Sequence, residues 1–262
     1  MKKLLVVLAA CLLVFGVAGR ANAYFAQGDL IRVVYQTTAS GGTYEQATDL
    51  GSVASIEANP SSLTASGDQY NLETGAGGAK AFSSLSNLDV AYFAVNTSTP
   101  EFWTSGTTGA SETNNGYTGA LATMTAANNI LAHAYAPTAS SNGTANAWYL
   151  LTGANAYYKL MDGNGTNVGS FNQYYLSGTG DGEIALVAGG SVQQDLFDWT
   201  NPSTKSTILG SLTLTTTLSS TGIISTSATP AAGTVPIPPS VLLFGSGLLG
   251  LVGIRRRNLF NF

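Results

Sequence analysis

The feature that most constrains the fold is a two-residue alternation at positions 212–218. Leucine or threonine occupies the even positions, and threonine occupies 213, 215 and 217. Because successive side chains of a β-strand point to opposite faces of the sheet, this pattern gives one mainly apolar face and one hydroxyl face. It predicts a strand whose sheet packs one face against a core.

Much of the chain from Tyr24 onward consists of short β-branched and aromatic runs between Gly, Asn, Ser and Thr clusters, which is typical of strands and turns. One helix is predicted at 120–135, where Leu121, Met124 and Leu131 recur at three- and four-residue steps. A polar loop is expected at 104–117. The predicted strands are 30–36, 90–96, 192–199 and 212–218, with one hairpin formed by 147–152 and 156–161 and another by 172–177 and 183–188.

These elements predict a mostly β fold, an antiparallel sandwich or jelly-roll-like domain with one helix. An N-terminal signal helix and a C-terminal hydrophobic helix are expected to flank it. The predicted divisions are a signal peptide at 1–23, an exported β-rich domain at 24–218, a Thr/Ser/Ala/Pro linker at 219–234 and a sorting tail at 235–262.

The N-terminus has the three parts of a secretory signal peptide. Two lysines precede an apolar run at 4–17, and the small-residue cleavage sequence includes Ala21 and Ala23. We expect export through the Sec translocon and cleavage by signal peptidase after Ala23. A lipoprotein signal at Cys11 is the alternative, which is disfavoured because the apolar run continues past that cysteine. Cys11 is the only cysteine, so the exported domain is expected to have no disulfide.

The C-terminus carries an apolar segment at 240–254 between a proline-rich sequence and a cationic cluster. A helix at 241–254 would be about 21 Å long, which is short against about 30 Å of bilayer hydrocarbon. The cluster at one end predicts a cytoplasmic C-terminus and a domain outside the membrane. The flanking signals consist of Val235, Pro236, Ile237, Pro238, Pro239, Arg255, Arg256 and Arg257.

The run VPIPPSVLLFGSGLLGLVGIRRR resembles the C-terminal sorting tail of PEP-CTERM proteins, the substrates of exosortase. Ile237 stands where the name-giving signature has glutamate, so the resemblance is to the subgroup that reads V-P-[apolar]-P. It implies a transient stop at the inner membrane, cutting near 235–239 by an exosortase-like protease or transpeptidase, and transfer to the cell surface or the extracellular matrix. It also implies a setting of exopolysaccharide and biofilm.

The charge balance excludes some partners of the exported domain. All 14 acidic residues lie between Asp29 and Asp198, whereas only four basic residues lie outside the terminal signals, so the domain has a formal charge of about −10. This charge argues against nucleic acid and against anionic lipid as partners of the domain. Membrane contact is expected only through the C-terminal helix, and only transiently.

One candidate metal site stands out. Asp162, Asn164 and Thr166 place oxygen ligands at alternate positions, as the start of a calcium loop does, but the later EF-hand positions do not match. A hairpin turn explains the same Asp-Gly and Asn-Gly pairs. No other cofactor is expected.

Three tryptophans, Trp103, Trp148 and Trp199, could stack on sugar rings; burial in a β core is the alternative.

Two pairs of carboxylates, Asp181 with Glu183 and Asp195 with Asp198, have the residue types that glycoside hydrolases use for catalysis. The only histidine, His133, is interpreted as a solvated or helix-capping side chain.

The sequence thus predicts an exported surface or matrix protein without catalysis of its own, which an exosortase sorts and processes. One alternative is a secreted carbohydrate-binding or carbohydrate-active protein. A further alternative is an uncleaved tail-anchored membrane protein.

Overall fold

The computed structural model describes residues 25–63, 70–71, 82, 84–113, 124–134, 146–161, 182–199 and 207–231. These belong to one compact unit, Met1–Ala231, and residues Ala232–Phe262 form a second. Both terminal signals lie outside the described residues. Among the helices that are described, none has the length and apolar character needed to span a bilayer.

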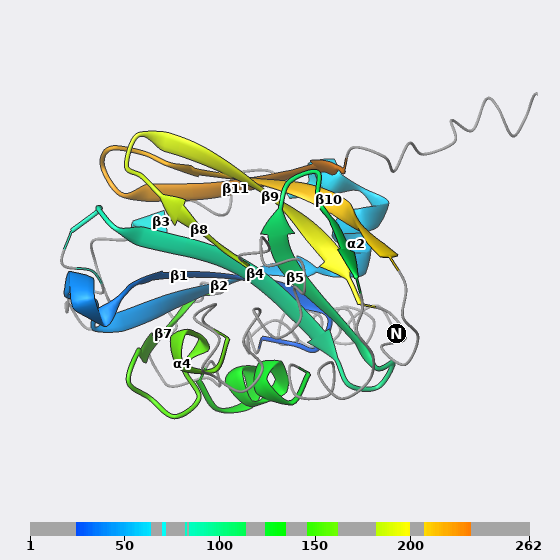
Figure 1. The fold of residues 1–262 in the computed structure, drawn as a ribbon, viewed down its shortest axis with the longest axis horizontal. Helices are drawn as coiled ribbons and strands as arrows, with labels where there is room; N and C mark the ends of the chain where they lie inside the picture. Colours follow the sequence, from blue (N-terminus) through cyan, green and yellow to red (C-terminus); the bar gives the residue numbers. More distant parts are fainter. Residues whose placement is uncertain are drawn as a thin grey trace, which may run out of the picture. The chain divides into compact units, whose positions relative to one another are not determined.

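The described residues form an 11-stranded antiparallel sheet with the order β3-β11-β10-β9-β5-β4-β1-β2-β7 (Figure 1). Strand β6 pairs with β10, and β8 pairs with β4, off this path. The predicted mostly β, antiparallel class is confirmed. The strands are β1 Asp29–Gln36, β2 Tyr44–Ser52, β3 Tyr70–Asn71, β4 Leu88–Asn96, β5 Glu101–Thr107, β6 Ser111–Thr113, β7 Asn146–Leu150, β8 Glu183–Leu186, β9 Gly190–Asp198, β10 Thr207–Leu218 and β11 Ile223–Pro230.

The sheet curls into a half-barrel, as a buried polar network demonstrates. Arg32 on β1 is fully buried, and its Nη1 donates a hydrogen bond of 2.8 Å to Oγ1 of Thr226 on β11. Strands β1 and β11 are well separated in the order of the sheet. Tyr92 on β4 bonds Thr226 at 2.9 Å and also bonds Thr216 on β10. These contacts across the hollow exist only because the sheet bends back over itself.

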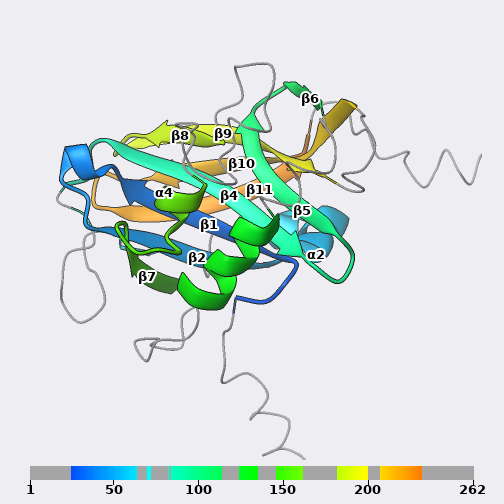
Figure 2. The ribbon, with the colours of Figure 1, turned by 60° about the horizontal axis from the view of Figure 1, so that its bottom comes forward.

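Each face of the curled sheet has its own apolar core. The inner face forms an interior core that α2 (Val53–Ala58) helps to close. The outer face forms an outer core against the helical residues 124–134, which end in a π-helical turn at Ile130–Ala134, and α4 (Tyr157–Leu160) (Figure 2). The interior core includes Leu30, Val34, Leu88, Val90, Tyr92, Ala94, Trp103, Leu196, Leu212, Leu214, Leu218 and Ile224. The outer core includes Ile31, Val33, Tyr35, Ala91, Phe93, Val95, Phe102, Ile130, Leu131, Tyr157, Phe197 and Trp199.

The alternation that predicted strand β10 is confirmed. Leu212, Leu214 and Leu218 are at most 1% exposed and lie in the interior core. The hydroxyls of Thr215 and Thr217 are on the other face, where they bond side chains of β9. The helix predicted at 120–135 is also present wherever it is described, from 124 to 134.

The linker predicted at 219–234 is wrong for residues 223–230, which form β11. This strand pairs with β10 from Ile224 opposite Leu218 to Pro230 opposite Leu212. Its alternate residues Ile224, Thr226 and Ala228 are buried. Thr226 bonds Arg32 and Tyr92 across the hollow, so a hydroxyl-bearing residue suits this position.

Two local predictions also fail. Residues 157–160 form α4 instead of a hairpin arm, because the carboxylate of Glu45 on β2 accepts the backbone N–H groups of Tyr157 (2.7 Å) and Tyr158 (2.9 Å). A buried acceptor at the first turn satisfies donors that a helix leaves unpaired.

The polar loop expected at 104–117 contains the end of β5 and all of β6. Strand β9 pairs with β5, and strand β10 pairs with β6.

The network around Arg32 gives a stability prediction. Replacing Thr226 by valine keeps the shape but removes the acceptor of the guanidinium bond, so we expect the free energy of unfolding to fall by about 2 kcal/mol. Thr229→Val is the matched control, because Thr229 lies on the exposed face of the same strand. It should change stability by less than about 0.5 kcal/mol. Chemical denaturation of the full-length chain measures both, and equal values for the two variants would contradict the role of the network.

Candidate functional site

The sheet forks along one edge of β4. The first half of β4 pairs with β8, from Leu88 opposite Leu186 to Ala91 opposite Glu183. The second half pairs with β5, from Phe93 opposite Thr104 to Asn96 opposite Glu101. Strand β5 then leaves β4 and pairs with β9 up to Thr107. Strands β8 and β9 therefore diverge on either side of the junction.

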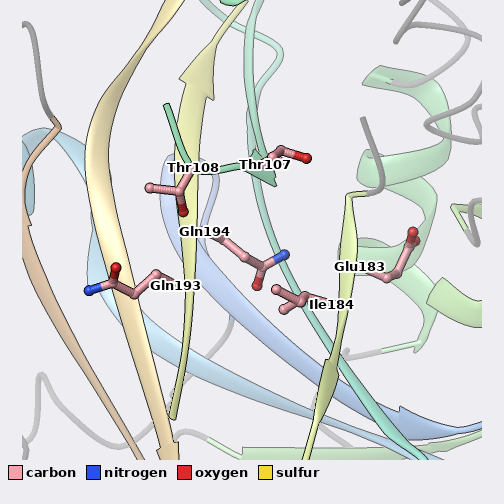
Figure 3. A pocket seen from close by; sticks show the side chains of 7 residues that line it. Thr107, Thr108, Glu183, Ile184, Gln193 and Gln194 are labelled. Carbon is pink, nitrogen blue, oxygen red and sulfur yellow. The ribbon is translucent and has the colours of Figure 1, made fainter. Parts of the chain in front are cut away.

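A pocket of about 320 Å³ lies in this fork (Figure 3). Its walls come from the end of β5, from β9 and from β8, three strands that share no local sequence signal. The lining residues are Gly106, Thr107, Thr108, Glu183, Ile184, Gln193 and Gln194. The volume is at the lower end of the range for small-molecule sites.

Ser105 closes the apex of the fork. At Tyr92 the edge of β4 passes from β8 to β5, and the Tyr92 N–H donates to Oγ of Ser105 at 2.8 Å. The same hydroxyl donates to the carbonyl oxygen of Gly182, which precedes β8, at 2.6 Å. A side chain thus supplies the hydrogen bond that a neighbouring strand supplies elsewhere in the sheet.

Gln194 forms the buried wall of the pocket. The side chain is 2% exposed, and its Nε2 donates to the Gly182 carbonyl oxygen at 2.8 Å. Its Oε1 accepts no hydrogen bond from the part of the chain that the structure describes. Figure 3 shows the amide pointing toward Ile184 across the fork, whereas Gln193 points the opposite way.

Asp195 holds the rim of the pocket in place. Its Oδ2 accepts the Gly109 N–H at 2.7 Å, and its Oδ1 accepts the Thr213 hydroxyl at 2.6 Å. The first bond fixes the turn that follows Thr107. Gly210 lies directly beside the carboxylate, and a Cβ there would approach Cβ of Asp195 to 2.7 Å, so the site requires glycine.

The glycosidase-like pairing of Asp195 with Asp198 is not supported by the geometry. Asp195 lies opposite Thr213, on the outer face, whereas Asp198 lies opposite Trp103, whose ring is in the interior core. The two carboxylates are therefore on opposite faces of the sheet. Of the other pair, Glu183 borders the pocket and accepts the Tyr157 hydroxyl at 3.2 Å, while Asp181 lies outside the described residues.

The sugar-stacking role considered for Trp103 and Trp199 is wrong, because both rings are buried. Trp103 is 7% exposed in the interior core, and Trp199 is 1% exposed in the outer core. Trp199 stacks on Phe102 with ring centroids 5.6 Å apart and donates its Nε1–H to Thr104 at 2.8 Å. Neither ring presents an open face to a ligand. Trp148 lies on β7 opposite Gln46.

The other predicted site residues lie outside the described residues. These are the calcium-loop residues Asp162, Asn164 and Thr166, the signal-peptide residues Ala21 and Ala23, and the processing signal at 235–239 and 255–257. Within the described ranges, no three His, Cys, Asp or Glu side chains are grouped so that they could hold a metal ion.

A second cluster, a carboxyl pair, joins the start of β1 to the end of β2. The pKa of Asp49 is raised from 3.8 to about 6, mainly by burial and in smaller part by the neighbouring Asp29. Burial also raises the pKa of Asp29. The protonated Asp49 donates to Asp29, which accepts the Ala26 N–H at 3.1 Å, while Asp49 accepts the Gly51 N–H at 2.8 Å. The two carboxyls share one proton at mildly acidic pH.

No family model, curated protein or solved structure matches this chain.

The apex of the fork gives a second stability prediction. Ser105→Ala leaves the buried Tyr92 N–H without its acceptor, so we expect a loss of about 1–3 kcal/mol in the free energy of unfolding. Ser111→Ala makes the same change at an exposed position of β6 and should cost less than about 0.5 kcal/mol. Denaturant unfolding of both full-length variants measures the two free energies of unfolding. A Ser105→Ala protein as stable as the wild type would contradict the role of the Ser105 hydroxyl in the fork.

The carboxyl pair predicts a pH dependence. Because the folded pKa of Asp49, about 6, lies above the unfolded value of 3.8, the proton stabilises the folded state at low pH, and this contribution is lost as the pH rises through 6. The loss from Asp49 is at most about 3 kcal/mol. Asp49→Asn keeps a donor to Asp29 without the titration, so its stability should fall less between about pH 4 and pH 7. If the stability of the variant and of the wild type changed equally with pH, the proposal that Asp29 and Asp49 share a proton would be contradicted.

Proposed function

We propose that the chain is an exported cell-surface or extracellular-matrix protein that an exosortase sorts and processes, with no catalysis of its own. The signal peptide starts export, and the tail halts the chain at the inner membrane. The enzyme then cuts near the proline-rich sequence at 235–239, and the β-rich domain is released or transferred to the surface. The reactive groups belong to the processing enzyme.

The end of the folded domain is the observation that supports this proposal best. Strand β11 ends at Pro230, and the compact unit ends at Ala231. The proline-rich signature begins at Val235, beyond that unit in the sequence. Residues next to proline favour extended backbone, which a processing enzyme can bind as a substrate strand. A cut at the signature would therefore leave every described strand intact.

The fold suits a domain that works outside the cell. The only cysteine lies in the signal peptide, so the domain depends on its two apolar cores and on the Arg32 network for stability. The curled sheet and its two covered faces support the finer assignment to a sandwich or jelly-roll-like fold, which we include in the proposal.

Mass spectrometry of surface and matrix material tests the sorting. In cells with exosortase, we expect mature C-termini near 235–239 and no peptide containing 255–262. In cells without the enzyme, the tail should remain attached in the membrane fraction. A variant with alanine at Arg255, Arg256 and Arg257 should stay unprocessed, because the cationic stop is gone.

Lys159→Ala is the control, because it removes a positive charge from an exposed position of the β-rich domain and should leave processing unchanged. Detection of the 255–262 peptide in mature surface material from cells that contain the enzyme would overturn the proposal. That result would favour the uncleaved tail-anchored protein.

A further inference from the structure

The fork pocket contains a buried acceptor that receives no hydrogen bond from the described residues. The orientation of the Gln194 amide is set by the Gly182 carbonyl oxygen, which can accept only from Nε2. Oε1 is therefore the atom that has no donor among the described residues. A buried carbonyl without a hydrogen bond is costly, so such an atom in a native pocket indicates a bound donor.

The lining of the pocket narrows the chemistry of that donor. Besides the amide, it offers the hydroxyls of Thr107 and Thr108 and the apolar side chain of Ile184. No lysine or arginine is among the described residues that line the pocket, which disfavours phosphate and carboxylate ligands. The carboxylate of Glu183 points away from Gln194 in Figure 3 and toward the face where Tyr157 lies, so it does not select a cation in the inner part of the pocket.

We propose that this pocket binds a neutral saccharide unit, with one ligand hydroxyl donating to Oε1 of Gln194. A sugar ring presents several hydroxyls and an apolar C–H face, which matches the threonine and amide groups on one side and Ile184 on the other. A pocket of about 320 Å³ is large enough for a small ligand and not for an extended buried chain, so it binds a single unit or the end of a chain.

The geometry of the fork prepares the site in advance. Ser105 and Gln194 both donate to the Gly182 carbonyl oxygen, which fixes the start of β8, and Asp195 fixes the turn after Thr107. Both walls of the pocket are thus held in place without the ligand, which lowers the cost of binding. The inference stands apart from the sorting proposal, because it depends only on residues of the folded domain.

Saturation-transfer NMR tests the inference on the full-length chain, kept soluble in a detergent without sugar head groups. The neutral probes are D-glucose, D-galactose, D-mannose and N-acetyl-D-glucosamine; D-glucosamine and D-glucuronate are the charged comparators. We expect at least one neutral sugar to receive saturation and the charged comparators to bind about tenfold more weakly or not at all.

Gln194→Leu removes the acceptor and should weaken binding about tenfold or more. Gln27→Leu is the matched control: it makes the same change at an exposed glutamine that does not line the pocket, and it should leave binding unchanged. Ile184→Phe fills the pocket but keeps the Gln194 amide, and it should also abolish binding. This variant tests the proposal if Gln194→Leu does not fold.

The proposal is overturned if no neutral sugar binds the wild-type chain, in which case the pocket holds only water. It is also overturned if the charged comparators bind as well as the neutral sugars, or if binding survives both Gln194→Leu and Ile184→Phe. Loss of binding in these two variants, with binding retained in Gln27→Leu, supports the proposal. Exosortase processing is unaffected by any of these outcomes.

Discussion

The hydrogen bond between Arg32 and Thr226 is the constraint on which the arrangement of the sheet depends. A fully buried guanidinium must find acceptors inside the protein, because water cannot reach it. Its acceptors include Thr226 on β11 and Thr48 on β2, at 2.8 and 3.2 Å, and these strands lie toward opposite ends of the sheet. The bonds form only when the sheet is curled, so a polar group specifies the curvature while the apolar residues around it supply most of the burial.

The fork in the sheet is linked to this curvature. Strand β4 runs through the middle of the sheet, and β5 leaves it to join β9, β10 and β11 on the other side of the hollow. Strand β8 occupies the edge of β4 that β5 vacates. The hydroxyl of Ser105 and the amide of Gln194 bridge the gap, and the pocket is the space that backbone pairing does not fill. Ser105 and Gln194 thus contribute both to the stability of the fork and to the candidate site.

Several acidic residues of the chain stabilise the fold in addition to giving it a negative charge. Asp195, Glu45 and the Asp29–Asp49 pair all accept backbone N–H groups at turns or at the start of a helix. Several of the carboxylates that give the domain its negative charge are therefore part of its framework. This explains why a search for catalytic pairs by sequence spacing finds Asp195 and Asp198, which the sheet separates onto opposite faces.

The sequence alone determined the elements whose signal is local: the alternation of Leu212, Leu214 and Leu218 gave a strand, and the period of Met124 and Leu131 gave a helix. The curl, the fork and the pocket were decided by the tertiary structure. Glu45 starts α4 from 112 residues away, and β11 is a strand because β10 pairs with it. Gln194 carries no motif, and only long-range register places its amide opposite Ile184. Local periodicity reports which face of an element is buried, whereas the partner across the fold depends on contacts that no local pattern encodes.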